Sequence, residues 1–227
     1  MIINNKSIKE FGANLLSRFI HPTKISYNLL TPDDSLVNVV GKRRYGQKQL
    51  QVSIEFYGSR AQIELNKSMF MQEILNEPVI QFNNIQNKKY IGYVDTVMIQ
   101  DQHYMFEVLE FSMQVHEESH EIENRFDSEI DIHLSSTMET PAIIEITPLA
   151  DISSVKVEGF DEDITIRNLK KGIPVIIDGK RLLVTEDGVN KFKDYDSWIF
   201  PSLKIGINNI RVSGNTSNRI IYSPRWL

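Results

Sequence analysis

Apolar residues recur at every second position in several segments of this chain of 227 residues, and this spacing constrains the fold more than any other feature. Leu50–Gly58 alternates in this way, as a β-strand with one buried face does. The same alternation runs through Tyr104–Val115, and the apolar run Tyr90–Ile99 precedes it. Since Asp101 and Gln102 lie between the two runs, we expect a long β-hairpin over residues 90–115.

One segment of the first part follows helical spacing instead. Apolar residues in Lys67–Asn76 recur at intervals of three and four, Asn66 can cap the first turn, and Pro78 ends the helix. We therefore expect one short helix in this part of the chain. Ser7–Leu16 is a second helix candidate, although Gly12 interrupts it.

The second part consists of short runs of strand type, separated by turn residues at regular intervals. The predicted strands are Ala142–Thr147, Ser154–Val157, Asp163–Arg167, Val175–Ile177, Arg181–Thr185, Ile205–Val212 and Arg219–Tyr222. Asp178 and Gly179 predict a type I′ turn between two of them, in which both central residues have positive φ. Strands at this spacing are typical of a β-sandwich or jelly roll.

An acidic stretch with few apolar residues, Glu117–Asp131, separates the two parts. Such a stretch is typical of a solvated linker, so we place a domain boundary near residue 126. The sequence therefore predicts a mainly β protein with two domains, residues 1–125 and 126–227. The first is sandwich-like with one short helix and the long β-hairpin, and the second is a β-sandwich.

The composition narrows the class of protein. The chain has no cysteine, which excludes a disulfide framework, a thiolate zinc site, an iron–sulfur cluster and a cysteine nucleophile. A net charge of −5 argues against nucleic-acid recognition. No segment approaches the roughly 20 apolar residues that cross a bilayer. Met1–Glu10 has no apolar core of a secretory signal, so we expect a chain made in a cytoplasm and no membrane partner.

His116, Glu117 and His120 match the H-E-x-x-H string, in which two histidines one helical turn apart bind zinc and the glutamate acts as a base. The string works only on a helix, whereas the residues before it alternate like a strand. We interpret the match as coincidental and expect no metal and no cofactor; a zinc hydrolase is the alternative. No nucleophile elbow, phosphate-binding loop or dinucleotide motif occurs, so we expect no enzyme.

The basic residues of the chain gather once, in Lys42, Arg43, Arg44 and Lys48. Glycines on both sides favour a solvated loop, contact with an acidic partner protein is the functional alternative, and phosphate contact is a third.

Four aromatic residues of the second part are candidates for a platform that stacks on sugar rings, although aromatic residues of a sandwich more often fill its core. They are Trp198, Trp226, Tyr195 and Tyr222. Three carboxylates nearby lack the spacing of a calcium loop and are interpreted as turn residues. They are Asp187, Asp194 and Asp196.

The C-terminal third carries a longer pattern. The pattern consists of the segments Ile177-Asp178-Gly179, Val184–Phe192, Trp198-Ile199-Phe200-Pro201-Ser202-Leu203, Gly206-Ile207-Asn208-Asn209-Ile210 and Ser213-Gly214. This pattern resembles the closing string of the distal tail proteins of long-tailed siphophages and related tail-like particles. The sequence departs from it at Ile205, where the family often has proline. The specific part of the resemblance covers about residues 175–227.

The resemblance implies a structural role for Asp178, Gly179, Trp198, Phe200, Pro201, Gly206, Asn208 and Gly214. It also implies that the N-terminal domain forms a ring, usually a hexamer, between the last ring of the tail tube protein and the tail-tip hub or fibre protein. The C-terminal domain would be a galectin-like sandwich that faces outward. The expected location is the virion tail tip, after synthesis in the cytoplasm of a bacterial host. A carbohydrate-binding module built on the C-terminal sandwich is the alternative function.

Overall fold

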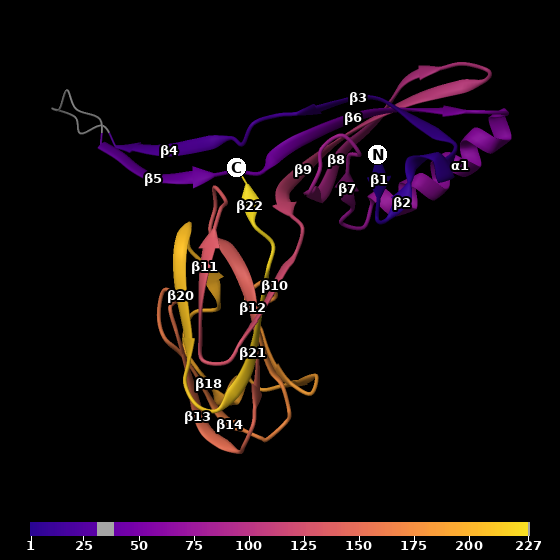
Figure 1. Cartoon of the computed structure of the whole chain (residues 1–227). Helices are drawn as coiled ribbons and strands as arrows, with labels where there is room; N and C mark the ends of the chain where they lie inside the picture. The colour runs from indigo at the N-terminus through magenta and orange to yellow at the C-terminus, as the bar shows by residue number, and fades with distance from the viewer. Residues whose placement is uncertain (31–38, 227) are drawn as a thin grey trace. The chain divides into compact units, whose positions relative to one another are not determined.

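The computed structural model describes residues 1–30 and 39–226, and of residues 27–30 and 39–45 it describes the backbone alone. Within these ranges the chain forms two compact units, Met1–Glu118 and Ser119–Trp226. Both units consist mainly of antiparallel strands (Figure 1). The mainly β fold expected from the alternating apolar pattern is therefore confirmed.

The first unit is one sheet with a helix on one face. Its elements are β1 (Ile2–Ile3), β2 (Lys6–Ser7), the 3₁₀ helix η1 (Ile8–Phe11), β3 (Ala13–Ile20), β4 (Ile25–Leu30), β5 (Val39–Tyr45), β6 (Lys48–Tyr57), α1 (Arg60–Ile74), β7 (Val79–Gln81), β8 (Lys88–Gln102) and β9 (Phe106–Ser119). The strand order in the sheet is β2-β1-β7-β8-β9-β6-β3, and β4 pairs with β5 in a separate ribbon.

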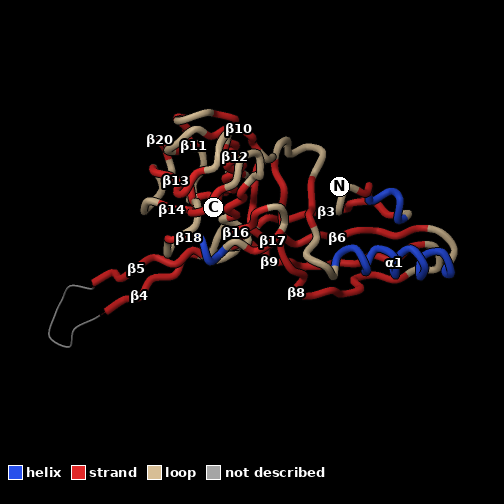
Figure 2. The backbone as a smooth tube through the Cα atoms, turned by 90° about the horizontal axis from the view of Figure 1, so that it is seen from below, coloured by secondary structure: helices blue, strands red, loops and turns tan. Residues whose placement is uncertain are grey.

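Helix α1 covers the apolar face of this sheet and runs alongside its strands (Figure 2). The Phe70 ring of α1 packs edge-on against Phe56 of β6 and Phe11 of η1, with ring centroids 5.6 and 5.9 Å apart. The alternating residues of β6 are buried against the helix, as the spacing in Leu50–Gly58 predicts. The predicted hairpin is also present, and His103 N donates to Phe106 O at its turn (2.8 Å).

The helix begins seven residues earlier than the sequence predicts, at Arg60, and Asn66 lies inside it. Ser59, in extended conformation, is the residue before its first turn. The apolar stripe is blurred because Leu65 and Met69 are exposed while Phe70 is buried, so spacing alone did not reveal the first two turns.

The expected helix over Ser7–Leu16 was wrong, because only the four residues of η1 are helical. Ser7 and Glu10 form a capping box, in which the Ser7 backbone N–H donates to the Glu10 carboxylate at 2.8 Å. Gly12 then adopts φ +57 and ends the turn. The capping box of Ser7 and Glu10 therefore starts a helix, and Gly12 ends it after one turn.

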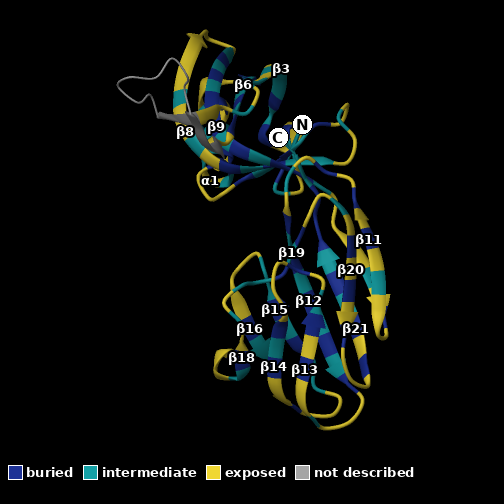
Figure 3. Ribbon diagram, turned by 90° about the vertical axis from the view of Figure 1, so that its left-hand side faces the viewer, coloured by how far each residue is buried: buried dark blue, intermediate teal, exposed yellow. Residues whose placement is uncertain are grey.

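The second unit is a sandwich of two sheets. Its elements are β10 (Ile122–Phe126), β11 (Glu129–Leu134), β12 (Thr140–Pro148), β13 (Ile152–Glu158), β14 (Ile164–Leu169), β15 (Val175–Asp178), β16 (Leu183–Glu186), β17 (Val189–Asn190), η2 (Phe192–Asp194), β18 (Tyr195–Asp196), β19 (Ser202–Leu203), β20 (Gly206–Val212), β21 (Thr216–Tyr222) and β22 (Arg225–Trp226). One sheet has the order β10-β21-β12-β15-β16-β17 and the other β11-β20-β13-β14-β18. Their buried residues form one core (Figure 3).

The acidic stretch between the two predicted domains is not a linker. It contains β10 and β11, which pair with β21 and β20 and so belong to the second unit. In β11 the acidic Glu129 and Asp131 are exposed, whereas Ile132 and Leu134 are buried. Few apolar residues are sufficient to form these strands, because only every second side chain of a strand points into the core.

The predicted type I′ turn lies elsewhere than expected. Asp178 and Gly179 do not have positive φ; β15 and β16 are joined by a longer loop in which Leu182 has φ +57. Positive φ at two successive residues occurs instead at Asp187 (+49) and Gly188 (+75), between β16 and β17. Both pairs read Asp-Gly, and the local sequence does not distinguish them.

Candidate functional site

The H-E-x-x-H string lies on strand β9, where the helical spacing of its two histidines has no meaning. Glu117 is buried; its Oε2 accepts a hydrogen bond from Lys48 Nζ, and its Oε1 forms an ion pair with Lys88 Nζ, each at 2.5 Å. His116 Nε2 lies 3.3 Å from Glu118 Oε1, and His120 follows the end of the strand. The central carboxylate is therefore committed to an internal ion cluster, and among the described residues no three His, Asp or Glu side chains converge as metal ligands.

The four basic residues lie on two strands, β5 and β6. Lys42, Arg43 and Arg44 lie on strand β5 rather than in a loop, and their side chains are outside the described part of the chain. Lys48 is 9% exposed and bound to Glu117, so it is a structural residue and not the surface contact expected from the sequence.

A second buried charge lies under α1. Glu107 of β9 accepts from Lys67 at 2.7 Å and from Arg60 at 2.8 Å. Burial by itself would raise the pKa of Glu107, but these hydrogen bonds outweigh it and hold the pKa below its usual value. Glu107 thus ties the helix to the hairpin while remaining ionised.

The closing string of the second unit forms a structural corner. Gly206 has φ +95, and Asn208 is 4% exposed, with its side chain bonded to the backbone around the turn. Asn208 therefore acts through its amide group, whereas the unusual backbone angle belongs to Gly206 alone. Gly214, at φ +89, takes the next turn.

Gly179 lies close to the backbone of Pro201, which belongs to the same string. Its N–H donates to Ala142 O at 2.9 Å, and Ala142 N donates to Pro201 O at 3.0 Å. A Cβ at Gly179 would lie 2.2 Å from Pro201 O, so only glycine fits this approach. Asp178 accepts from the backbone of Lys180 at 2.8 Å and shapes the loop that follows.

Phe200 and its neighbours cover one end of the core. Its ring stacks on Tyr195 with centroids 5.4 Å apart and on Phe192 at 6.3 Å. The Tyr195 hydroxyl donates to Ile199 O, and burial raises the pKa of Tyr195 to about 12. None of these groups is placed for reaction; the string supports the fold.

Trp198 does not fill the core, contrary to the expectation for an aromatic residue of a sandwich. It is 97% exposed, whereas Tyr195 and Tyr222 are buried. Trp226 is half-buried and its Nε1 donates to Ser119 Oγ at 2.9 Å. The four aromatic residues are thus in different environments, and Trp198 alone has the exposed ring that a stacking ligand requires.

The three aspartates considered for calcium serve the local fold instead. Asp194 accepts from Asn168 Nδ2 at 2.8 Å and pairs with buried Lys191 at 3.1 Å, and these contacts hold its pKa below the usual value. Asp196 pairs with Arg167, and Asp187 lies in the tight turn before β17. Asp187 is a turn residue as interpreted from the sequence, whereas Asp194 lies in η2 and Asp196 in β18.

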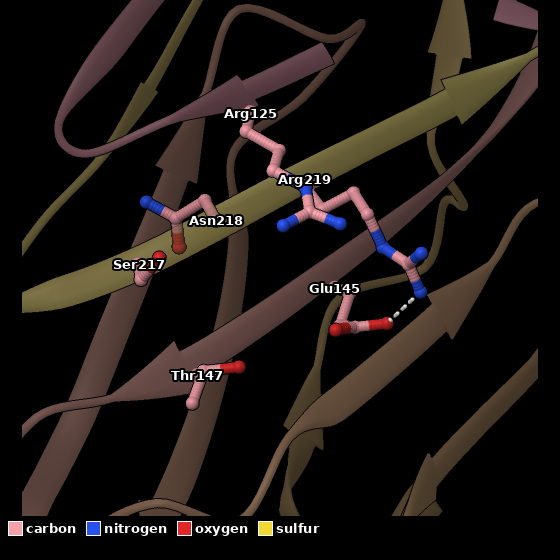
Figure 4. A pocket seen from close by; sticks show the side chains of 6 residues that line it. All are labelled: Arg125, Glu145, Thr147, Ser217, Asn218 and Arg219. Carbon is pink, nitrogen blue, oxygen red and sulfur yellow. Dashed lines mark hydrogen bonds and ion pairs between the residues drawn. The ribbon is translucent and has the colours of Figure 1, made fainter. Parts of the chain in front are cut away.

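A polar pocket of about 300 Å³ lies on the outer face of β10, β21 and β12 (Figure 4). Arg125, Arg219 and Glu145 lie side by side across these strands, and Arg219 Nη2 binds Glu145 at 2.5 Å. Ser217 and Thr147 line the pocket two register pairs further along. The pocket thus offers guanidinium and amide donors, one carboxylate and two hydroxyl groups to a polar ligand.

An apolar groove of about 480 Å³ lies in the first unit, where α1 passes β8. Its lining residues are Lys67, Ser68, Met71, Val97, Met98, Ile99 and Leu109. The sequence did not predict this groove, because it depends on the helix lying along the hairpin. The unbroken apolar run Val97–Ile99, without strand alternation, is its one signal in the sequence.

Among the described residues, no helix combines the length and apolar character that a bilayer crossing needs.

Comparison with known proteins gives both a family and a fold. The family described as siphovirus-type tail component, C-terminal domain, matches residues 135–226. The whole chain is similar in fold to SPP1 Dit (gp 19.1), described as a paradigm of the hub adsorption apparatus in phages that infect Gram-positive hosts. The TM-score is 0.79 at 10% identity, covering 100% of this chain and 98% of that chain.

Two structures of the phage P2 baseplate in its activated conformation contain a similar chain. For the calcium form the TM-score is 0.58 at 10% identity, covering 96% of this chain and 92% of that chain. For the strontium form the values are 0.60, 11%, 95% and 91%. No curated protein sequence matches at a significant level. The resemblance to the siphophage distal tail family is confirmed: residues 135–226 match the siphovirus-type tail component C-terminal domain, and the whole chain has the fold of SPP1 Dit.

Proposed function

We propose that this protein is a structural adaptor of a phage or phage-like tail tip, and that it assembles into a ring, usually a hexamer, that joins the tail tube to the tail-tip hub. The observation that carries the proposal is the likeness of the whole chain to SPP1 Dit, from end to end. The role is structural rather than catalytic, because the chemically suggestive residues are used in the fold. Glu117 binds two lysines, and the closing string supports a corner.

The two units have separate tasks in this proposal. The first unit, Met1–Glu118, forms the ring, and the second, Ser119–Trp226, faces outward; the sequence placed this boundary at residues 125 and 126. The tail tube protein binds on one side of the ring and the hub or fibre protein on the other. Lys42, Arg43 and Arg44 of β5 are retained as candidate contacts to a partner protein.

Electron microscopy of the purified full chain tests the proposal. We expect six-fold rings with a central channel, and a matching mass by size-exclusion chromatography with light scattering. A strict monomer at high concentration, also in the presence of its tail tube and hub proteins, would contradict the proposed role.

Carbohydrate binding by the sandwich is the second candidate, favoured by the exposed ring of Trp198 and by the polar pocket beside Arg219. A glycan array tests it. The adaptor role expects no signal, whereas a lectin role expects a signal that Trp198→Ala removes without unfolding the protein. Leu149→Ala, at a residue 49% exposed in the same unit, is the matched control. Trp226→Ala tests the half-buried aromatic residue separately.

A further inference from the structure

Among the described residues of the first unit, the sheet ends on one side at β3, which pairs with β6 alone, and on the other at the short strand β2. The long strand β8 extends beyond its outer neighbour β7 and so has an open edge as well. Strand β7 pairs with β8 only through Val79–Ile91 and Ile80–Tyr90. Among the described residues, the outer edge of β8 beyond Ile91 therefore has no paired strand. Unpaired backbone groups along such an edge are a template for another strand.

The open part of β8 is apolar where it borders the groove beside α1. Met98 and Ile99, which line the groove, are 50% and 54% exposed. The segment Thr96–Gln100 contains no charge, proline or glycine. An exposed edge of this composition aggregates unless something covers it, because natural edge strands are usually protected by charge, proline or a bulge.

The open edge of β3 has matching properties. Leu16 and Phe19 are 52% and 57% exposed. The register of β3 against β6 shifts between Leu15 and Ser17, which leaves Leu16 as the extra residue of a bulge. The bulge divides β3 into two regularly paired stretches, Ala13–Leu15 and Ser17–Ile20.

We infer that the distal edge of β8 and the adjoining groove bind the β3 edge of a second copy of this chain. The backbone of an edge strand needs a strand as its partner, and β3 offers one that also carries exposed apolar side chains. Because the two edges are different and lie on opposite sides of one sheet, each copy can bind one neighbour on each side. Repetition of such a head-to-tail contact by rotation closes a ring. The inference rests on the proposed ring and specifies its joint.

Two double variants of the full chain test the joint. Met98→Lys with Ile99→Lys places charge on the β8 edge, and Leu16→Lys with Phe19→Lys does so on the β3 edge. All four residues are half-exposed or more, so the fold should persist, as circular dichroism would verify. Ile205→Lys with Ile207→Lys, at residues 57% and 79% exposed, adds the same charge to the second unit, which contains neither edge strand.

Light scattering should give the mass of a single chain for each edge variant alone. An equimolar mixture of the two should give twice that mass, because each variant keeps the edge that the other has lost. The control variant should assemble as the wild type does. Self-association of the β3 variant would overturn the inference by showing that β8 pairs with itself.

The test also separates the joint from the ring. Rings formed by both edge variants would overturn the joint and leave the proposed function standing. A monomeric wild type, with or without partner proteins, would overturn both. If the control variant also failed to assemble, added surface charge would explain the loss of assembly in the edge variants. That result would count against the proposed contact between β8 and β3.

Discussion

The Asn208 side chain forms two hydrogen bonds with the backbone of Lys204: its Oδ1 accepts from Lys204 N and its Nδ2 donates to Lys204 O, each at 2.8 Å. One buried amide thus takes the place of two backbone partners across the turn at Gly206. An aspartate has the same shape but cannot donate, so it would leave the Lys204 carbonyl without this bond. The corner therefore requires asparagine in particular.

We predict that Asn208→Asp lowers the free energy of unfolding by about 1–3 kcal/mol, the usual loss when a buried polar group is left unsatisfied. Urea denaturation of the full chain measures the change. Asn209→Asp is the matched control, since Asn209 is exposed and binds only the Asp131 side chain in the described structure. If both variants lost the same free energy of unfolding, the hydrogen bonds of Asn208 would contribute no more to stability than an exposed side-chain contact.

Gly179→Ala should cost more than about 3 kcal/mol, because the added carbon would lie 2.2 Å from Pro201 O and 2.6 Å from Ala142 O. Both obstacles are backbone atoms, which cannot turn away as a side chain can. Gly188→Ala has open space around its Cβ but a φ of +75, so its cost should be about 1 kcal/mol from backbone strain alone. Thermal unfolding of the two variants measures the difference, and a reversed order would refute the close approach.

Glu117→Gln should lower the free energy of unfolding by about 3–5 kcal/mol, because it leaves buried Lys48 without its carboxylate. The matched control is Asp196→Asn, which breaks an ion pair with Arg167 whose side chains are more than half exposed and should change little. Chemical denaturation compares the two. A small loss for Glu117→Gln would mean that the lysines reach water without it.

Stability should fall in alkali because of Tyr90. Burial raises the pKa of this residue to about 12, with a further contribution from Glu117, whereas the pKa of an unfolded tyrosine is near 10. The neutral form stabilises the fold fully below pH 10, and this contribution is lost as the pH rises from 10 to about 12.

Tyr90→Phe should therefore make the free energy of unfolding less dependent on pH in this window. Tyr104→Phe, at a residue 81% exposed, should leave the dependence unchanged. Urea denaturation at a series of pH values measures both. An unchanged slope in Tyr90→Phe would show that this tyrosine titrates normally in the folded protein.

Much of the fold could be predicted from spacing, because strands such as β12, β13 and β20 bury every second residue. The start of α1 could not, since Leu65 and Met69 are exposed on a helix whose buried stripe is narrow. Nor could β10 and β11, whose acidic outward residues resemble those of a linker. In each case the inward residues are few, and their meaning depends on the partner strand.

The candidate sites show the same limit more sharply. The string around Gly206 and Asn208 identified the corner, but the need for glycine at Gly179 comes from Pro201, which is distant in sequence. Similarly, Lys48 looks like part of a basic surface until the fold brings Glu117 beside it. The roles of Gly179 and Lys48 depend on contacts with residues distant in sequence, and sequence spacing alone does not predict such contacts.

Strand β21 lies between β10 and β12, and β20 pairs with both β11 and β13. Four strands made early in the second unit thus pair with two strands that are synthesised later. During translation, the sandwich therefore cannot close until β20 and β21 have left the ribosome. Completion of this unit is a late step, so a truncated chain would expose the edges of β10, β11 and β12 and become a target for cellular proteases.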